Sequence, residues 1–106
     1  MSVVNFSLTL EARFDGHRAT LVEFALDGDL SPDALASLQL PEVDPTAGVI
    51  LSGRGPIWLY AAMTHNYHVS RWVATHDPRV GAVVVSTHHP MAPKVGTVLS
   101  FQPVLA

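Results

Sequence analysis

A short apolar run, a glycine-rich turn and a helix follow one another in the middle of this chain, and they constrain its fold most. Residues 48–51 (Gly-Val-Ile-Leu) form a continuous apolar run, short enough for a buried strand. Residues 52–55 (Ser-Gly-Arg-Gly) then turn the chain, and Pro56 suits the first position of a helix that reaches about Tyr67. A buried strand that leads directly into a helix is typical of α/β sheets with parallel strands.

The flanking segments supply the remaining elements of this sheet. Loose alternation at 3–14 and 18–26 predicts two antiparallel strands, because Asp15-Gly16 between them is a hairpin-turn signal. We also expect a short helix at 32–38, strands at 72–75 and 82–86 joined by a tight turn at 77–81, and an edge strand at 98–101. This order predicts one α/β domain over residues 1–106, with a mixed, partly parallel β-sheet flanked by helices.

Composition narrows the function classes. With 106 residues, of which 48% are hydrophobic, the chain can bury a core of its own. The net charge of −3 argues against binding to long DNA or RNA, although backbone amides and one arginine suffice for a small phosphate ligand. The absence of cysteine excludes disulfides and thiolate metal sites, and no apolar run approaches the roughly 20 residues that span a bilayer. We therefore expect a soluble, cytoplasmic protein without a membrane partner.

The glycine turn is a candidate phosphate site. A strand that ends in Ser-Gly-x-Gly-Pro before a helix brings backbone N–H groups close to the positive end of the helix dipole. Ser52 and Arg54 add a hydroxyl and a guanidinium. The structural alternative is a tight turn in which the glycines relieve backbone strain. The turn lacks the Gly-Lys-Ser/Thr of a P-loop and the third glycine of a dinucleotide fingerprint, so both interpretations stay open.

A second group of candidates follows the helix. His65 and His68 are three residues apart and share one helix face, and together with Asp77 they form a set that suits manganese, zinc or iron. As a histidine, His68 is suited to acid–base chemistry near neutral pH, and Arg79 is suited to neutralising charge on a phosphate. The alternatives are a histidine pair that caps helix carbonyls and an Asp-Pro-Arg turn in which Arg79 pairs with Asp77.

The remaining histidines are weaker candidates. His76 is expected to point to the opposite sheet face from Asp77, and His88-His89 precedes a proline in a loop. His17 is a weaker candidate as well. The predicted helix, some ten residues or about 15 Å long, separates turn 52–56 from turn 77–79. We therefore expect these two turns at opposite ends of the helix, where one subunit does not bring both to the same phosphate.

Two sequence blocks resemble a known family. Residues 52–59 (Ser-Gly-Arg-Gly-Pro-Ile-Trp-Leu) and 72–85 (Trp-Val-Ala-Thr-His-Asp-Pro-Arg-Val-Gly-Ala-Val-Val-Val) flank the pair His65 and His68. This pattern resembles the small CRISPR-associated ring nucleases of type III systems, distant relatives of the CRISPR-associated Rossmann-fold (CARF) proteins. His76 departs from the pattern, since that family often has tyrosine, phenylalanine or another non-titrating residue there.

The resemblance implies a Rossmann-like homodimer that binds and cleaves cyclic tetra-adenylate, the second messenger of type III systems, and so switches off antiviral signalling. It also implies a Mn²⁺ cofactor, activity on RNA 3′ ends, and head-to-tail stacking of dimers into tetramers or filaments around the ligand. His68, Asp77 and Arg79 fall on the family's catalytic positions, and His65 falls on the other histidine of the pair. The family's ligand-binding loop falls on Ser52, Gly53, Arg54, Gly55 and Pro56.

Two other function classes fit the residues. One is a sensor that captures a cyclic oligoadenylate or an RNA tetranucleotide without cutting it and acts through a partner. The other is a regulatory protein whose histidines bind a metal for assembly. The set of His68, Asp77 and Arg79 favours an enzyme over the sensor, because binding alone does not require it. Loss of a dimer on chelation would support the metal-assembly protein.

Overall fold

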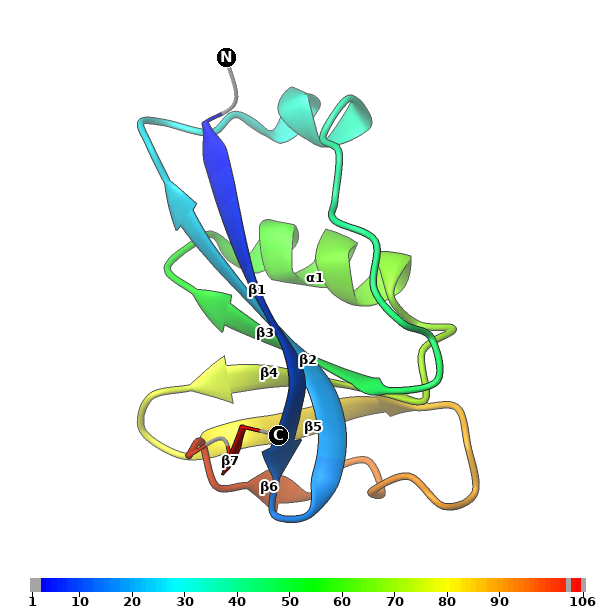
Figure 1. Cartoon of the computed structure of the whole chain (residues 1–106). Coiled ribbons are helices and arrows are strands. Elements are labelled where there is room, and N and C mark those ends of the chain that lie inside the picture. Colours follow the sequence, from blue (N-terminus) through cyan, green and yellow to red (C-terminus); the bar gives the residue numbers. More distant parts are fainter. Residues whose placement is uncertain (1–2, 103, 106) are drawn as a thin grey trace.

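A computed structural model describes residues 3–102 together with the backbone of 104–105. It contains a single seven-stranded sheet in the order β6-β5-β4-β3-β2-β1-β7, with one α-helix and one 3-10 helix (Figure 1). The elements are β1 (Val4–Phe14), β2 (His17–Leu26), η1 (Pro32–Ala36), β3 (Gly48–Gly53), α1 (Ile57–Asn66), β4 (Trp72–Asp77), β5 (Gly81–Thr87), β6 (Val98–Leu99) and β7 (Val104–Leu105).

The sheet is mixed, as predicted. β2 pairs with β3 and β3 with β4 in parallel, whereas the other neighbouring strands pair antiparallel. β1 and β2 form the predicted hairpin, and its two turn residues have positive φ angles, 51° at Asp15 and 85° at Gly16. Two positive φ values are what a two-residue hairpin turn of type I′ requires, so the Asp-Gly signal is confirmed. The β3–α1–β4 segment is a parallel crossover unit at the centre of the sheet.

One face of the sheet is covered by helix. Leu59, Met63 and Tyr67 follow one another at intervals of four residues, and they pack on the central strands through buried residues such as Val49 and Val73. η1 lies on the same side, since Leu35 and Leu38 pack against the same cluster (Figure 1).

The second face is covered by the sheet itself. Phe14 and Ile50 belong to a separate core cluster against which Phe101 packs, and the rings of Phe14 and Phe101 lie 5.8 Å apart. β1 carries a bulge between Thr9 and Ala12, with Glu11 in the left-handed region at φ 57°, and such a bulge bends and twists its strand. β6 lies at one edge of the sheet. The chain then continues to β7, which pairs with β1 at the other edge.

The sheet thus curls onto itself, and this curl corrects the predicted architecture. The sequence predicted a sheet flanked by helices, but in the described part of the chain both helices lie on one face. The bent sheet buries the apolar residues of its other face, so no second layer of helices is needed there. β7 and the 3-10 geometry of Pro32–Ala36 were also not predicted.

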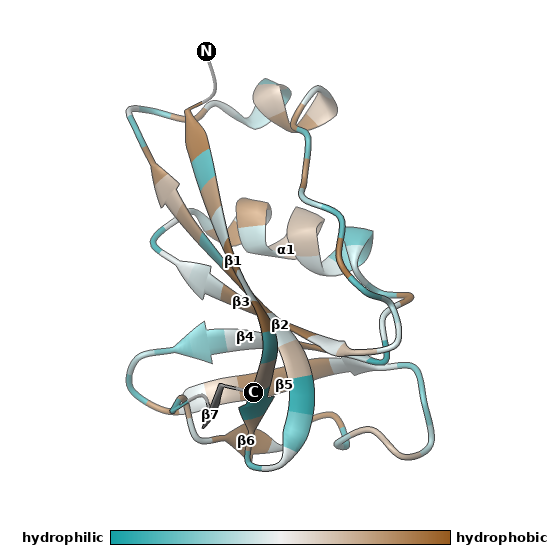
Figure 2. Cartoon of the chain, in the orientation of Figure 1, coloured by the Kyte–Doolittle hydropathy of each residue, from teal (hydrophilic) through white to brown (hydrophobic). Residues whose placement is uncertain are grey.

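α1 is only partly covered within one chain. Only Leu59 and Met63 are buried among its ten residues, and the side chain of Ile57 is 87% exposed. Figure 2 shows that the helix passes from hydrophobic residues at its start to hydrophilic ones at its end. Among the described residues, none of the helices has both the length and the apolar character needed to cross a membrane.

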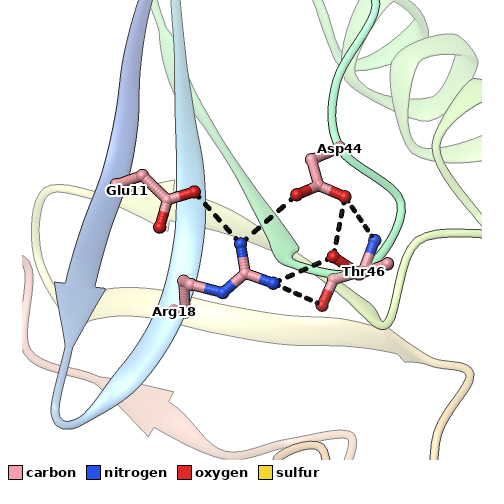
Figure 3. Close-up of polar contacts among 4 residues, drawn as sticks. All are labelled: Glu11, Arg18, Asp44 and Thr46. Atoms are coloured by element: carbon pink, nitrogen blue, oxygen red, sulfur yellow. Dashed lines mark hydrogen bonds and ion pairs between the residues drawn. The ribbon is translucent and has the colours of Figure 1, made fainter.

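A polar cluster fixes the long connection that leads into β3 (Figure 3). The Arg18 guanidinium donates to Glu11 Oε1 at 3.2 Å, to Asp44 Oδ2 at 3.3 Å, and to Thr46 Oγ1 at 2.9 Å. Thr46 in turn donates to Asp44 Oδ1 from its hydroxyl at 2.7 Å and from its backbone N–H at 2.9 Å. These hydrogen bonds, first those from Thr46 and then those from Arg18, lower the pKa of Asp44. The cluster ties the bulge of β1 to the start of β3.

Candidate functional site

The carboxyl ends of β3 and β4 meet at one edge of the sheet. Because these strands are parallel, with Leu51 opposite Thr75, the turn after β3 and the turn after β4 leave the sheet side by side (Figure 1, left). Between them lies a hollow of about 560 Å³, a size typical of small-molecule sites. It is lined by Gly53, Arg54, Gly55, Ile57, Tyr60, Thr75, His76, Asp77, Pro78 and Arg79.

The hollow corrects the prediction that the two turns lie at opposite ends of the helix. In a parallel crossover the helix carries the chain back to the start of the next strand, and β4 then returns it to the first edge. Arg54 and Arg79 therefore line the same hollow. Crevices at the carboxyl ends of parallel strands are the usual ligand sites of such sheets.

The glycines of the turn are required by close packing. A Cβ on Gly53 would lie 2.3 Å from the backbone oxygen of Phe24, and one on Gly55 would lie 2.9 Å from the Phe24 ring. This observation supports the structural explanation of the glycines. The phosphate explanation stays open as well. The N-cap residue of α1 is Pro56, and among the described residues no side chain accepts a hydrogen bond from the first N–H groups of the helix there. The first N–H groups of an uncapped helix suit an anion.

Tyr60 holds the turn in place, and sequence reasoning missed it. Its hydroxyl accepts a hydrogen bond from the N–H of Gly53 at 3.0 Å and donates one to the carbonyl of Gly53 at 2.6 Å. Its ring packs edge-on against Phe24, with centroids 5.2 Å apart. Burial raises the pKa of Tyr60, so the hydroxyl keeps its proton at neutral pH. An aromatic residue one turn into a helix that follows a glycine turn was the available signal.

The Asp-Pro-Arg turn is pre-formed by its own side chains. The N–H of Val80 donates to the carbonyl of Asp77 at 3.0 Å, which closes the predicted β-turn with Pro78 at its second position. Asp77 Oδ1 accepts from the backbone N–H of Arg79 at 2.9 Å and from its Nε at 3.3 Å, and Nη2 reaches Oδ2 at 3.3 Å. Hydrogen bonds from Arg79 lower the pKa of Asp77, which keeps it ionised.

This pairing is the alternative that the sequence left open. The Arg79 side chain is 87% exposed, so the pair lies at the surface of the hollow, where an anionic ligand can compete with Asp77 for the guanidinium. An ionised Asp77 can accept a proton or bind a cation, but it holds no proton to donate at neutral pH.

His76 is more central than the sequence predicted. It lines the hollow together with its neighbour Asp77, although we expected it to point away. Its Nδ1 lies 2.9 Å from the hydroxyl oxygen of Ser52, and its ring stacks on Phe101 with centroids 3.7 Å apart. Ser52, a predicted ligand-binding residue, thus has its hydroxyl engaged by this histidine.

His65 and His68 lie at the other end of the crossover unit. The rings of the two histidines stack with centroids 5.6 Å apart, and His88 packs edge-on against His68 at 6.4 Å. We call these three residues the histidine cluster. Nδ1 of His68 donates to the carbonyl of His65 at 2.9 Å, which leaves its Nε2 lone pair free to accept a proton.

The structure does not bring the histidine pair to Asp77. The cluster adjoins the start of β4, since the N–H of His88 donates to the carbonyl of Arg71 at 2.8 Å, whereas Asp77 ends that strand. Six residues of strand span roughly 17–20 Å. The predicted metal set of His65, His68 and Asp77 therefore does not form within one chain. Throughout the described residues, no three His, Cys, Asp or Glu side chains are placed to hold a metal ion.

Comparison with known proteins gives two findings. A family model described as "CRISPR-associated protein (Cas_csx3)" matches residues 23–100. An uncharacterised protein of Aquifex aeolicus (strain VF5) is 43% identical over 88 residues, which cover 78% of this chain and 78% of that protein. The family match includes the hollow and the histidine cluster.

Proposed function

This chain belongs to the CRISPR-associated Cas_csx3 family, and from that premise we propose that it binds and cleaves cyclic tetra-adenylate. Such cleavage would switch off type III CRISPR signalling. The observation that carries the proposal is the hollow at the carboxyl ends of β3 and β4. It combines an uncapped helix start with Arg54 and Arg79, which are groups that bind phosphate.

The hollow suits a cyclic nucleotide in two further ways. Ile57 is 87% exposed beside it, and Tyr60 also lines it, so apolar surface is present for an adenine ring. Two arginines against the one carboxylate of Asp77 give the hollow a local positive charge, on a chain whose net charge is −3. The β3–α1–β4 crossover is the part of the fold that we propose to be related to Rossmann-like CARF domains.

Cleavage is assigned to His68, which lies away from the hollow. Its free Nε2 can take the proton of a ribose 2′-OH, whose oxygen then attacks the adjacent phosphorus. The bond from phosphorus to the 5′-oxygen breaks, the 5′-oxygen takes up a proton, and a 2′,3′-cyclic phosphate remains. The ligand itself supplies the nucleophile, so the protein has to provide alignment, a base and charge neutralisation.

The separation of hollow and histidine cluster supports head-to-tail stacking of copies. One copy would bind the ring in its hollow, and a second copy would present His68 to the exposed side of the same ring. The predicted Mn²⁺ ligands could meet in the same way, with His65 and His68 from one copy and Asp77 from the next. A single chain does not bring these ligands together in its described residues. Nε2 of His68 cannot bind the ion and take the 2′-OH proton at once, so the metal route and the base route are alternatives.

A sensor that binds without cutting is the second candidate. The observation that favours it is the pairing of Arg79 with Asp77 far from His68, because a single copy then holds a binding surface without a base.

Incubation with cyclic tetra-adenylate separates the two functions. A ring nuclease gives linear products that end in a 2′,3′-cyclic phosphate, at a rate that falls about 100-fold in His68→Ala while ligand affinity is retained. Binding without linear products, with and without Mn²⁺, would identify a sensor. Absence of binding would refute both functions.

A further inference from the structure

His76 is held from two directions at the wall of the hollow. Its Nδ1 lies 2.9 Å from the Ser52 hydroxyl on the neighbouring strand β3. One face of its ring lies flat on Phe101, with an interplanar angle of 9° and centroids 3.7 Å apart. The side chain therefore has one nitrogen and one ring face in use, which leaves Nε2 for a ligand.

The Phe101 ring that supports the imidazole of His76 is itself held in place. Phe101 packs against Phe14 in the core of the curled sheet, with centroids 5.8 Å apart. The N–H of the preceding residue, Ser100, donates to Asp15 Oδ2 at 2.8 Å in the turn of the β1–β2 hairpin. The imidazole of His76 therefore rests on the curled sheet, which limits the directions in which Nε2 can point.

We propose that His76 is a phosphate-binding residue of the hollow, with its imidazole positioned by Ser52 and Phe101. In this assignment the Ser52 hydroxyl donates to Nδ1. The ring hydrogen is then on Nε2, which donates it to a phosphate oxygen of the bound cyclic nucleotide. Arg54 and Arg79 supply charge to the same ligand, and His76 adds a directed hydrogen bond. The inference rests on the proposed function, since it assumes that cyclic tetra-adenylate occupies this hollow.

Two amide substitutions test which nitrogen matters. Glutamine places its amide nitrogen near the position of imidazole Nε2, whereas asparagine places it near Nδ1. We expect His76→Asn to bind cyclic tetra-adenylate about 10-fold more weakly than wild type in calorimetry, as suits a hydrogen bond to a charged group. His76→Gln should bind within about 3-fold of wild type, because it keeps the donor. Thermal melts of both variants establish that they are folded.

The role of Ser52 is tested without ligand. Nitrogen-15 NMR of the free protein at pH 8 should place the His76 ring hydrogen on Nε2, and Ser52→Ala should give a mixture of the two tautomers. Ser52→Thr keeps the hydroxyl and should restore the wild-type spectrum.

The outcomes separate this inference from the proposed function. If wild type binds the ligand and the two amide variants bind equally well, the role of His76 is wrong and the hollow keeps its proposed ligand. A ring hydrogen on Nδ1 in the wild-type protein likewise overturns the assignment. If wild type does not bind cyclic tetra-adenylate at all, the proposed function fails, and the assignment of His76 to its phosphate fails with it.

Discussion

Tyr60→Phe should loosen the glycine turn at a cost that the structure allows us to work out. The substitution removes two hydrogen bonds, one from the N–H of Gly53 and one to its carbonyl. At about 1 kcal/mol net for each bond, the free energy of unfolding should fall by about 2 kcal/mol. For a domain of this size, that corresponds to a drop in Tm of roughly 8–16 °C. The phenyl ring keeps the contact with Phe24, so no cavity adds to this figure.

Tyr67→Phe is the matched control. The hydroxyl of Tyr67 donates a single hydrogen bond, to the carbonyl of Pro41, at the end of α1 away from the hollow. Its loss should therefore lower the free energy of unfolding by about 1 kcal/mol. Both changes in the free energy of unfolding are to be measured by urea unfolding followed by tryptophan fluorescence. Tyr60→Phe should also weaken ligand binding, because Gly53 lines the hollow, whereas Tyr67→Phe should leave affinity unchanged. A Tyr60→Phe protein as stable as wild type, or less destabilised than Tyr67→Phe, would refute this reasoning.

Three further predictions concern the turns and the base. Gly53→Ala should be more destabilising than Gly55→Ala in urea unfolding, because its Cβ would meet a backbone oxygen at 2.3 Å instead of a side-chain ring at 2.9 Å; equal losses would contradict the packing explanation of the glycines. Arg79 holds the pKa of Asp77 below its ordinary value of 3.8. This interaction stabilises the fold above that pH and is lost as the pH falls through the lowered pKa. The stability difference between wild type and Asp77→Asn should therefore narrow from pH 6 to pH 2, and a constant difference would count against the pair. His68→Ala should slow cleavage about 100-fold without changing the ligand Kd, and wild-type cleavage by this variant would remove His68 from the mechanism.

Local patterns in the sequence predicted the individual strands well. The Asp15-Gly16 turn and the run at 48–51 each specify a local conformation through their own residues, and both appear where expected. The curl of the sheet depends instead on the bulge near Glu11 and on pairing between β1 and β7, which are more than 90 residues apart. No local pattern encodes that contact, so the second face was expected to need a helix.

In the candidate site too, the sequence predicted local features but not the contacts between distant segments. The residue types of both turns and of the histidine pair were identified from the sequence, but their grouping was wrong. Grouping depends on strand order and direction: parallel β3 and β4 bring Arg54 and Arg79 to one edge and leave His68 at the other. Tyr60 and His76 were missed or ranked low because their roles come from contacts with Gly53 and Phe101, which sequence spacing does not show.

We propose that the ligand binds at one edge of the sheet and that His68 cleaves from the opposite edge of another copy. Complementation by mixing two variants tests this claim most directly. The double variant Arg54→Ala/Arg79→Ala should lose ligand binding but keep His68, and His68→Ala should bind the ring but lack the base. Each alone should be nearly inactive. An equimolar mixture should recover about a quarter of the wild-type cleavage rate, because one stacked contact in four pairs an intact hollow with an intact His68. The triple variant that combines all three substitutions, mixed with Arg54→Ala/Arg79→Ala, is the control and should give no recovery. No recovery in the test mixture, together with a cleavage rate per subunit that does not change with protein concentration, would place a complete site in each copy.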